Sequence, residues 1–516
     1  MKRIYLIFAL SFITLFCQAQ TYESVTYFMV DGLSNDRFSK LLAEEKLPNI
    51  KSMVDHGLYV KQGIVSFPSM TGYGFYPFLT GVDASESEIL GLRWLDRDQK
   101  GAHFRNYVGR TNIHMNQDIR DDVKLIFEYF GEEDKTISIN TYCNRGVTEN
   151  VNTGFSHVTS KYDTDQAFGR LEDFPIIGRR LFKDIHEFER NVQDIALEQL
   201  NEDPKVHWIT LASPDARNHV HGTDEIYDQL IIDIDKIIGR YISKSKVLGQ
   251  NRLFAFISDH GVRDVKYNLR PEKSLEERTG VKLHRGAAAN MFSLSLAERD
   301  ETYIGYDGKY VVNGNLSAFI YLRSNNEWLP RLYESDLRSY KGKDIIKTLI
   351  DLEGIGMILY RGDGNSYKVE SKLGTGEIFT RGELISYKTV DEDPLDYAFD
   401  MEQQLSFDKF QHMDLVLEMS ANTEYPGALE RIINILDKEN SPDLVLLSSK
   451  DYDLAEDYEP FVKNYKGGHG GIHKDCLSVP FILYGQDMKT SQVSIMRSED
   501  FGKMIFRYLD IDLVEQ

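Results

Sequence analysis

Short runs of apolar, β-favouring residues recur along the chain, and each ends in a polar, acidic or glycine-containing turn. The runs are residues 25–30, 206–211, 253–257, 444–447 and 479–484. Such near-continuous apolar strands are typical of a sheet whose two faces are both covered by helices. Apolar residues at helical spacing predict helices at 36–56, 187–200 and 223–243. Strands that alternate with helices predict an α/β fold, with helices on both sides of a mostly parallel central sheet.

The stretch from about 291 to 440 has a different pattern. Residues 315–323, 356–361 and 367–387 are typical of short strands and hairpins with glycine-rich turns, and 414–438 mixes strand and helix. A chain of 516 residues is also long for one compact core. We therefore expect a smaller α+β lobe at 291–440, inserted into a catalytic α/β core formed by residues 21–290 and 441–516.

The first twenty residues differ from the rest of the chain. Lys2 and Arg3 precede a 13-residue, mostly apolar run at 4–16, and polar sequence begins at Thr21. This pattern predicts a secretory signal peptide at 1–20, and hence a secreted or periplasmic protein. Cys17 is a candidate for a lipid anchor, but the bulky Phe16 before it argues against one. No later segment has the length of a transmembrane span.

The formal net charge of −21 constrains the partners. A surface this acidic repels nucleic-acid duplexes, so we expect no duplex binding. A small phosphorylated substrate is still compatible, because bound metal cations reverse the local sign of the charge. Beyond the predicted signal peptide the only cysteines are Cys143 and Cys476, which make no disulfide scaffold or zinc motif. Whether they pair, and how the chain oligomerises, the sequence leaves open.

Asp and His residues follow the apolar runs at several points. Asp31 follows the first run, Asp215 and His219 the second, and Asp259 and His260 the third, while His469 lies in a glycine-rich segment near the end. In parallel sheets, ligands bind beyond the carboxyl ends of the strands. Zinc takes nitrogen and oxygen ligands, and pairs of metals commonly serve phosphate ester hydrolysis. A threonine hydroxyl, which needs activation before it attacks, would fit such a cluster.

Each of these residues also has a structural interpretation. Asp31 and Asp259 are placed where turn and helix-capping aspartates are common. Ser69 is an alternative nucleophile to Thr71. Because these Asp and His residues occur together in this order along the chain, we favour the metal site over the structural interpretation.

Five motifs together resemble the alkaline phosphatase superfamily, specifically its type I phosphodiesterase/nucleotide pyrophosphatase branch. They are Asp31-Gly32, Pro68-Ser69-Met70-Thr71 with the later Thr80-Gly81, Asp215 to His219, Ser258-Asp259-His260-Gly261 and Gly468-His469-Gly470. The resemblance implies an alkaline-phosphatase-like three-layer sandwich and two divalent metal ions, with zinc expected.

The resemblance also assigns roles. It implies one metal site at Asp215, His219 and His469. It implies a second at Asp31, Asp259 and His260, with Thr71 bridging toward it. Thr71 would attack phosphorus to form a phosphothreonine, from which water releases the phosphate.

One position departs from the family pattern. Diesterase-like members carry an Asn about twenty residues after the nucleophile, which holds a phosphoryl oxygen, and here Leu92 occupies that position. Arg93 and Asn112 are candidate substitutes. The sulfatase pattern, which shares this fold, is disfavoured because Met70 stands where its Arg would be.

These observations predict a metal-dependent phosphoric ester hydrolase of the phosphodiesterase/nucleotide pyrophosphatase type. Phosphodiesters and pyrophosphates are the leading substrates, followed by phosphomonoesters and phosphonates. The alternative from another class is a non-catalytic, metal-holding protein that binds a phosphorylated ligand.

Overall fold

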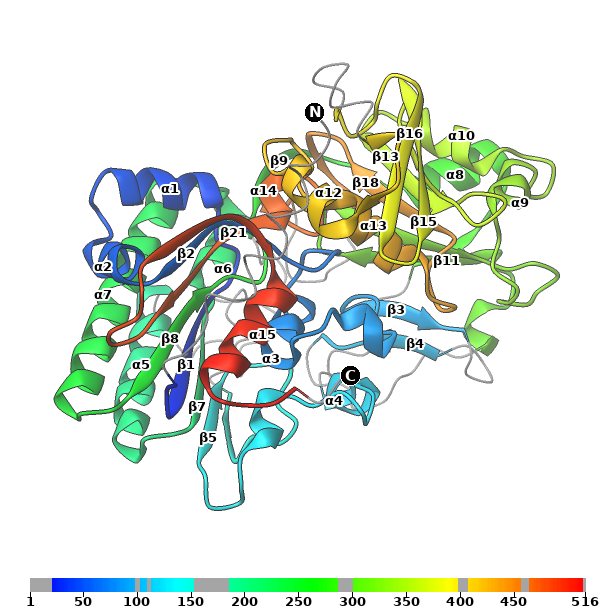
Figure 1. The fold of residues 1–516 in the computed structure, drawn as a ribbon. Coiled ribbons are helices and arrows are strands. Elements are labelled where there is room, and N and C mark those ends of the chain that lie inside the picture. Colours follow the sequence, from blue (N-terminus) through cyan, green and yellow to red (C-terminus); the bar gives the residue numbers. More distant parts are fainter. Residues whose placement is uncertain are drawn as a thin grey trace.

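A central sheet of eight strands forms the larger lobe (Figure 1). The computed structural model describes residues 21–97, 103–108, 113–152, 185–285, 300–397, 407–455 and 464–513, so the predicted signal peptide lies outside the described residues. In spatial order the strands are β22 (Ser491–Arg497), β2 (Leu58–Ile64), β21 (Ser478–Tyr484), β8 (Arg252–Ile257), β1 (Ser24–Val30), β7 (Val206–Leu211), β5 (Thr136–Ile139) and β6 (Glu149–Val151). Strand β21 runs antiparallel to both of its neighbours, and the other adjacent pairs are parallel. The predicted mostly parallel sheet is confirmed.

Helices cover both faces of this sheet, as the apolar strands predict. Successive residues of β1 point to opposite faces: Phe28 and Val30 pack in one hydrophobic cluster, and Tyr27 and Met29 pack in another. The first cluster includes residues of α1 (Asn35–Ala43), α2 (Pro48–His56), α5 (Ile185–Gln199) and α7 (Glu225–Val247). The second includes residues of α3 (Tyr76–Thr80) and α15 (Ser498–Tyr508). The three-layer sandwich is thereby confirmed.

The helix predictions hold for α5 and α7 but not for 36–56. That segment forms two helices, α1 and α2, instead of one. The break falls at Glu45, whose φ is +57°, and α2 begins at Pro48. A proline disfavours helical backbone at the residue before it, so Leu47 ends the continuous pattern.

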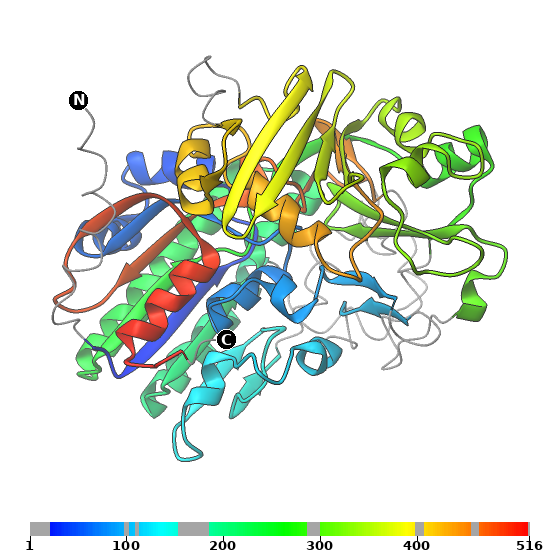
Figure 2. The ribbon, with the colours of Figure 1, turned by 45° about the vertical axis from the view of Figure 1, so that its right-hand side comes forward.

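A second sheet of nine strands builds the other lobe, which lies beside the first (Figure 2). Its order is β10 (Leu283–His284), β11 (Gly308–Asn313), β12 (Ser317–Leu322), β18 (Leu444–Ser448), β13 (Ile355–Arg361), β14 (Tyr367–Glu370), β15 (Gly374–Arg381), β16 (Leu384–Asp391) and β17 (Gln411–His412). Residues of α8 (Pro271–Thr279), α9 (Glu334–Arg338) and α10 (Ile345–Ile350) pack on one face.

The prediction that residues 444–447 return to the central sheet is wrong. They form β18, which pairs antiparallel with β12 and β13 in the nine-stranded sheet. An apolar run shows that both strand faces are buried, but it does not show in which sheet. Residues 414–438 are mainly helical, as α12 (Met413–Ser420) and α13 (Ala428–Leu436), rather than a mixture with strand.

The boundaries 21–290, 291–440 and 441–516 stay predictions. The nine-stranded sheet begins at Leu283 and ends, in sequence, at Ser448. One hydrophobic cluster contains Phe481 of the central sheet together with Phe319 and Leu359 of the second sheet, so the two lobes share buried apolar contacts.

Smaller elements complete the structure around the site. Strand β9 (Arg263–Asn268) pairs with β19 (Asp451–Asp453) and with β20 (Gly467–Gly468). Strands β3 (Arg93–Asp96) and β4 (His103–Asn106) form a hairpin. Two short helices are α4 (Ile113–Asp118) and α14 (Lys474–Leu477). The pairing of β20 with β9 brings the segment before His469 next to the segment after His260.

Candidate metal centre

Three neighbouring parallel strands deliver the predicted residues to one edge of the central sheet. Asp31 follows β1, Asp259 and His260 follow β8, and α6 (Ser213–His221) begins two residues after β7. The backbone joins these strand ends: Asp31 N donates to Leu211 O (3.0 Å) and Leu33 N donates to His260 O (3.0 Å). The strand order β8-β1-β7 therefore explains how residues far apart in sequence meet.

The first predicted group comes together. Asp31, Asp259 and His260 are buried, and each offers a ligand atom within 4.8 Å of the others. His260 Nε2 lies 3.2 Å from Asp31 Oδ1 and 3.6 Å from Asp259 Oδ2. This spacing suits a shared cation.

The second predicted group lies beside the first. His219 Nε2 is 3.2 Å from Asp215 Oδ2, and His469 Nε2 is 3.9 Å from Asp215 Oδ1. The ring of His469 stacks on that of His260 at 3.8 Å between centroids. Asp215, His260 and His469 also satisfy the 4.8 Å spacing, so His260 lies between the two groups.

Backbone carbonyls orient the three imidazoles. Each ring places its Nδ1 near a carbonyl oxygen and turns its Nε2 toward the carboxylates. The Nδ1 contacts are His219 with Gly467 O (3.2 Å), His260 with Gly261 O (3.1 Å) and His469 with Ser69 O (3.0 Å). A carbonyl at one ring nitrogen fixes the tautomer that presents the other nitrogen to a metal.

Thr71 reaches the first group with its hydroxyl. Its Oγ1 donates to Asp31 Oδ1 at 3.3 Å and lies 3.1 Å from His260 Nε2. Thr71 is partly exposed, whereas the carboxylates and imidazoles around it are almost all buried. The hydroxyl thus occupies the solvent side of the cluster.

Ser69, the alternative nucleophile, is engaged elsewhere. It is fully buried, its Oγ donates to Gly471 O (2.9 Å), and Gly470 N donates to the same Oγ (3.2 Å). Ser69 therefore joins the segment that carries Thr71 to the segment that carries His469.

The charges of the cluster are strongly perturbed by burial. Burial, followed by the neighbouring Asp215 carboxylate, raises the pKa of Asp31 well above its usual value. Burial and Asp31 together raise the pKa of Asp259 in the same way. The raised pKa values mean that the protein places too little positive charge near Asp31 and Asp259 to keep both carboxylates ionised.

In the second group, the attraction between Asp215 and the imidazoles outweighs the effect of burial on the pKa values of Asp215 and His219. Burial opposes the charge of Asp215, yet His219 and the other imidazoles hold the pKa of Asp215 below its usual value. Burial likewise opposes protonation of His219, but Asp215 raises the pKa of His219 to about 9. Burial lowers the pKa of His469 well below the ordinary value for histidine.

Two buried carboxylate oxygens of the cluster lack a hydrogen bond within the described part of the chain. They are Asp215 Oδ1 and Asp259 Oδ2, one in each group. Unsatisfied buried carboxylate oxygens are costly unless a cation or donor completes them. Together with the oriented imidazoles, they form a nitrogen and oxygen donor set that fits divalent cations such as zinc.

Comparison with known proteins agrees with this arrangement. The family model described as "Type I phosphodiesterase / nucleotide pyrophosphatase" matches residues 25–317, more than half of the chain. The chain belongs to this family. It is accordingly a hydrolase of phosphoric ester bonds, and the resemblance found in the sequence is confirmed.

Solved structures of phosphodiesterase-family proteins share the fold. Human ectonucleotide pyrophosphatase/phosphodiesterase 5 matches with a TM-score of 0.53 and 14% identity, and the match covers 96% of each chain. An inactive threonine-to-alanine variant of the murine protein, in complex with AMP, matches with a TM-score of 0.53, 13% identity and the same coverage. No protein in a curated collection matches the sequence.

Leu92, which was predicted to occupy the family's Asn position, lies close to the nucleophile segment. A Cβ built on Gly72, next to the nucleophile position, would lie 3.1 Å from Leu92 Cδ2 and 2.9 Å from Tyr142 Cγ. Leu92 therefore stands beside Thr71 without a side-chain donor. Arg93, a candidate substitute, donates instead to Val312 O (3.2 Å), and Asn112 lies outside the described residues.

Asn315 is a supporting residue of this phosphodiesterase-family site that the sequence patterns missed. Its Oδ1 accepts from His469 N (3.2 Å), and its Nδ2 donates to Gly467 O and Asp453 Oδ2 (both 3.2 Å). It comes from the turn between β11 and β12 in the second lobe. No motif marked it, because an Asn in a strand-connecting turn is common.

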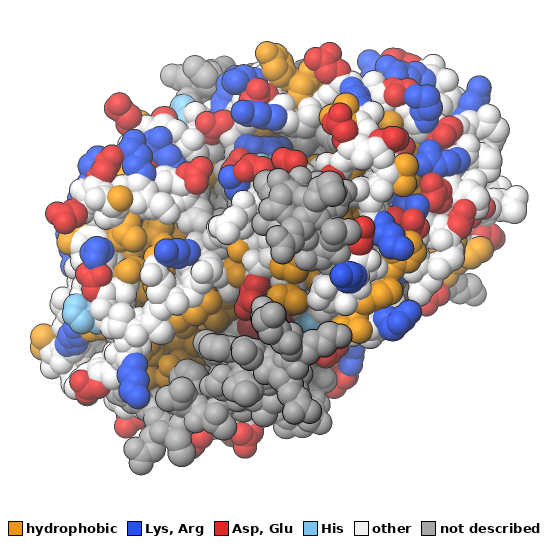
Figure 3. Space-filling model, turned by 45° about the horizontal axis from the view of Figure 1, so that its top comes forward, with side chains coloured by type: hydrophobic (Ala, Val, Ile, Leu, Met, Phe, Trp, Pro, Cys, Tyr) orange, Lys and Arg blue, Asp and Glu red, His pale blue; other side chains and the backbone are white. Residues whose placement is uncertain are grey.

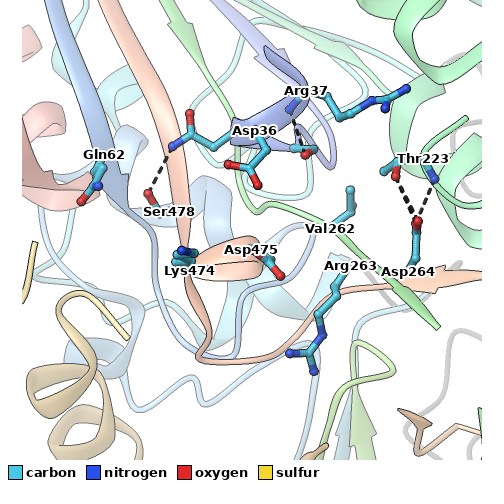
Figure 4. Close-up of a pocket in the computed structure, with 12 residues that line it drawn as sticks. Asp36, Arg37, Gln62, Thr223, Val262, Arg263, Asp264, Lys474, Asp475 and Ser478 are labelled. Carbon is cyan, nitrogen blue, oxygen red and sulfur yellow. Dashed lines mark hydrogen bonds between the residues drawn. The ribbon is translucent and has the colours of Figure 1, made fainter. Parts of the chain in front are cut away.

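A cavity of about 350 Å³ lies apart from the candidate metal ligands (Figure 4). It is lined by residues that follow the site residues in sequence, including Ser34, Thr223, Val262 and Lys474, and by none of the seven predicted site residues. Figure 4 shows the Thr223 hydroxyl and amide donating to Asp264. The charged side chains that line it have both signs.

The outer surface and the cysteines bear on the remaining expectations. Acidic and basic side chains are interspersed over the face in Figure 3; the expected lack of duplex binding stays a prediction. Cys143 and Cys476 are both buried and unpaired with each other. In the described part of the chain, no helix combines the length and apolar character needed to cross a membrane.

Proposed function

We propose that this chain hydrolyses phosphodiesters or pyrophosphates at a site that holds two divalent cations, with zinc expected, and that Thr71 is the nucleophile. One observation carries the proposal: the Thr71 hydroxyl contacts both Asp31 and His260 at the open side of a buried carboxylate and imidazole cluster. The bound cations would offset the charge of the phosphoryl oxygens and favour the ionised hydroxyl.

The residues divide into three roles. Asp215, His219 and His469 would hold one cation, and Asp31, Asp259 and His260 the other. Thr71 would form a bond to phosphorus as the leaving alcohol or phosphate departs with the hydroxyl proton, giving a phosphothreonine that still carries the second ester group of a diester, and water would then release a phosphomonoester and restore the Thr71 hydroxyl. The buried surroundings exclude bulk water from all but the Thr71 side.

Substrate class follows from the family and from one neighbour. The murine neighbour's structure contains AMP, which supports a nucleotide-like phosphoester as substrate. Phosphomonoesters and phosphonates are the second choice, since Leu92 removes a donor from the phosphoryl pocket. The second lobe would shape that pocket: Asn313 of β11 accepts from Arg93 N (3.0 Å), so it fixes the backbone beside Leu92.

We also propose that residues 1–20 direct export, which places the site outside the cytoplasm. Removal of this segment would be seen as an N-terminus near residue 21 in protein purified from the secreting cell.

Purified protein loaded with zinc tests the proposed reaction. We expect turnover of bis-p-nitrophenyl phosphate above that of p-nitrophenyl phosphate, and an acid-stable p-nitrophenyl phosphoryl group on the Thr71 peptide after the diester reaction is quenched. Thr71→Ala should lose both while it retains metal; removal of one nucleophile commonly costs on the order of 10⁴-fold or more in rate. Thr490→Ala, at an exposed threonine on the surface, should behave as wild type.

Two results would overturn the proposal. A p-nitrophenyl phosphoryl group trapped on Ser69, with turnover lost in Ser69→Ala but kept in Thr71→Ala, would show that Ser69 and not Thr71 is the nucleophile. Full metal loading without turnover of either ester would instead favour the protein that only binds a phosphorylated ligand.

A further inference from the structure

Helix α6, which carries Asp215 and His219, begins without a cap of its own. The residue before it is Ala212, which has no side-chain acceptor, and its first turn contains Pro214, which has no N–H. The first N–H groups of a helix lack partners within the helix and need an acceptor from elsewhere. Glu189 of α5 supplies one: Ser213 N donates to Glu189 Oε1 at 2.7 Å.

This carboxylate is deeply buried. Glu189 is 4% exposed, and its Oε2 has no hydrogen bond among the described residues. Burial raises the pKa of Glu189 to about 7, although its contacts with Ser213 favour the charged form. A buried carboxyl group is costly, so its position at the positive end of α6 is the feature that offsets the cost.

The first turn of α6 also packs against the segment that follows β1. A Cβ built on Gly32 would lie 2.7 Å from Asp215 Cβ, so the chain after Asp31 packs directly on Asp215. The hydrogen bond from Ser213 N to Glu189 and the close packing of Gly32 on Asp215 together restrict the position of Asp215. His219, one turn later on the same helix, moves with it.

We infer that Glu189 is a positioning residue, a cap supplied by α5 that holds α6 so that Asp215 and His219 face a cation. The inference rests on the proposed function, because it concerns the same cation. Groups that orient metal ligands typically change metal affinity by about 10- to 100-fold when removed. Loss of Glu189 should therefore weaken the binding of one of the two zinc ions and leave the binding of the other unchanged.

Zinc affinities of the two sites, measured on the full chain by competition with a chromophoric chelator, test this. Glu189→Ala should bind one zinc about tenfold more weakly, with the other unchanged. Glu189→Gln keeps an oxygen that accepts from Ser213 N, so it should fall between alanine and wild type. Cobalt spectra should show one altered ligand field. Glu198→Ala, at an exposed glutamate of the same helix, should bind both ions as wild type.

The outcomes separate this inference from the proposed function. Wild-type protein that binds no zinc and hydrolyses no ester would refute the function itself. Two unchanged zinc affinities in Glu189→Ala and Glu189→Gln, alongside an active wild type, would refute the role of Glu189 alone. If the alanine variant does not fold, the glutamine variant decides: unchanged affinities reject the role, and a weakened single site supports it.

Discussion

Leu92 is the residue that most distinguishes the proposed phosphoryl pocket. It stands beside Gly72 and Thr71, where a donor would stabilise a phosphoryl oxygen in the transition state. One such donor is worth about 10²- to 10³-fold in rate in well-studied sites. We predict that Leu92→Asn raises kcat/KM for bis-p-nitrophenyl phosphate by about tenfold or more. Leu92→Met, which restores no donor, should leave it unchanged. A folded, zinc-loaded Leu92→Asn protein with no gain would show that another group already fills this role.

His219 should make metal binding at the proposed site depend on pH. Its pKa is raised to about 9, chiefly because the Asp215 carboxylate overcomes the effect of burial, so at pH 7 the imidazole carries a proton in metal-free protein. A metal binds the neutral ring, and its uptake must release that proton. We predict release of at least one proton when zinc binds at pH 7, falling by about one as the pH rises past 9. Calorimetry in buffers of different ionisation enthalpy measures this number. Zinc binding without proton release at pH 7 would contradict it.

At the scale of elements, the sequence predicts the strands and helices that have a long, regular pattern of apolar residues. Strands β1, β7, β8 and β21 and helices α5 and α7 were all predicted, because their patterns are long and regular. The sequence does not show which strands pair with one another. Strand β18 has the same apolar pattern as these strands, yet it belongs to the second sheet. The choice between sheets depends on contacts with β12 and β13, which lie more than eighty residues away in sequence.

The candidate site shows the same division. The residues predicted from motifs lie together, since motifs at the ends of β1, β7 and β8 are brought to one edge by the sheet itself. Supporting residues such as Asn315 and Glu189 were not predicted. They act through hydrogen bonds to the backbone of other elements, and side chains of many types satisfy such bonds, so no spacing marks them. Their identification requires the tertiary structure.

At the scale of the whole molecule, a buried ionic network joins the two lobes. Arg431 of α13, which is 1% exposed, makes a bidentate pair with Glu499 of α15 (2.8 Å to each oxygen). It also donates to Asp83 Oδ2 and to Ile64 O, both at 3.1 Å. Ile64 ends β2 and leads into the segment that carries Thr71. The second lobe therefore supports the nucleophile segment as well as the pocket wall.

This network predicts that the lobes unfold together. Arg431→Met would leave Glu499 and Asp83 buried without their partner, and breaking a buried pair in this way costs about 3–5 kcal/mol. We expect the free energy of unfolding in urea to fall by that amount, with tryptophan fluorescence and circular dichroism still following one transition, because the shared hydrophobic cluster couples the lobes. Lys347→Met, which breaks the exposed Lys347–Asp351 pair of the second lobe, should leave the transition in place, since exposed pairs contribute little. Two separate transitions in wild-type protein, or an Arg431→Met protein as stable as wild type, would show that the lobes are independent.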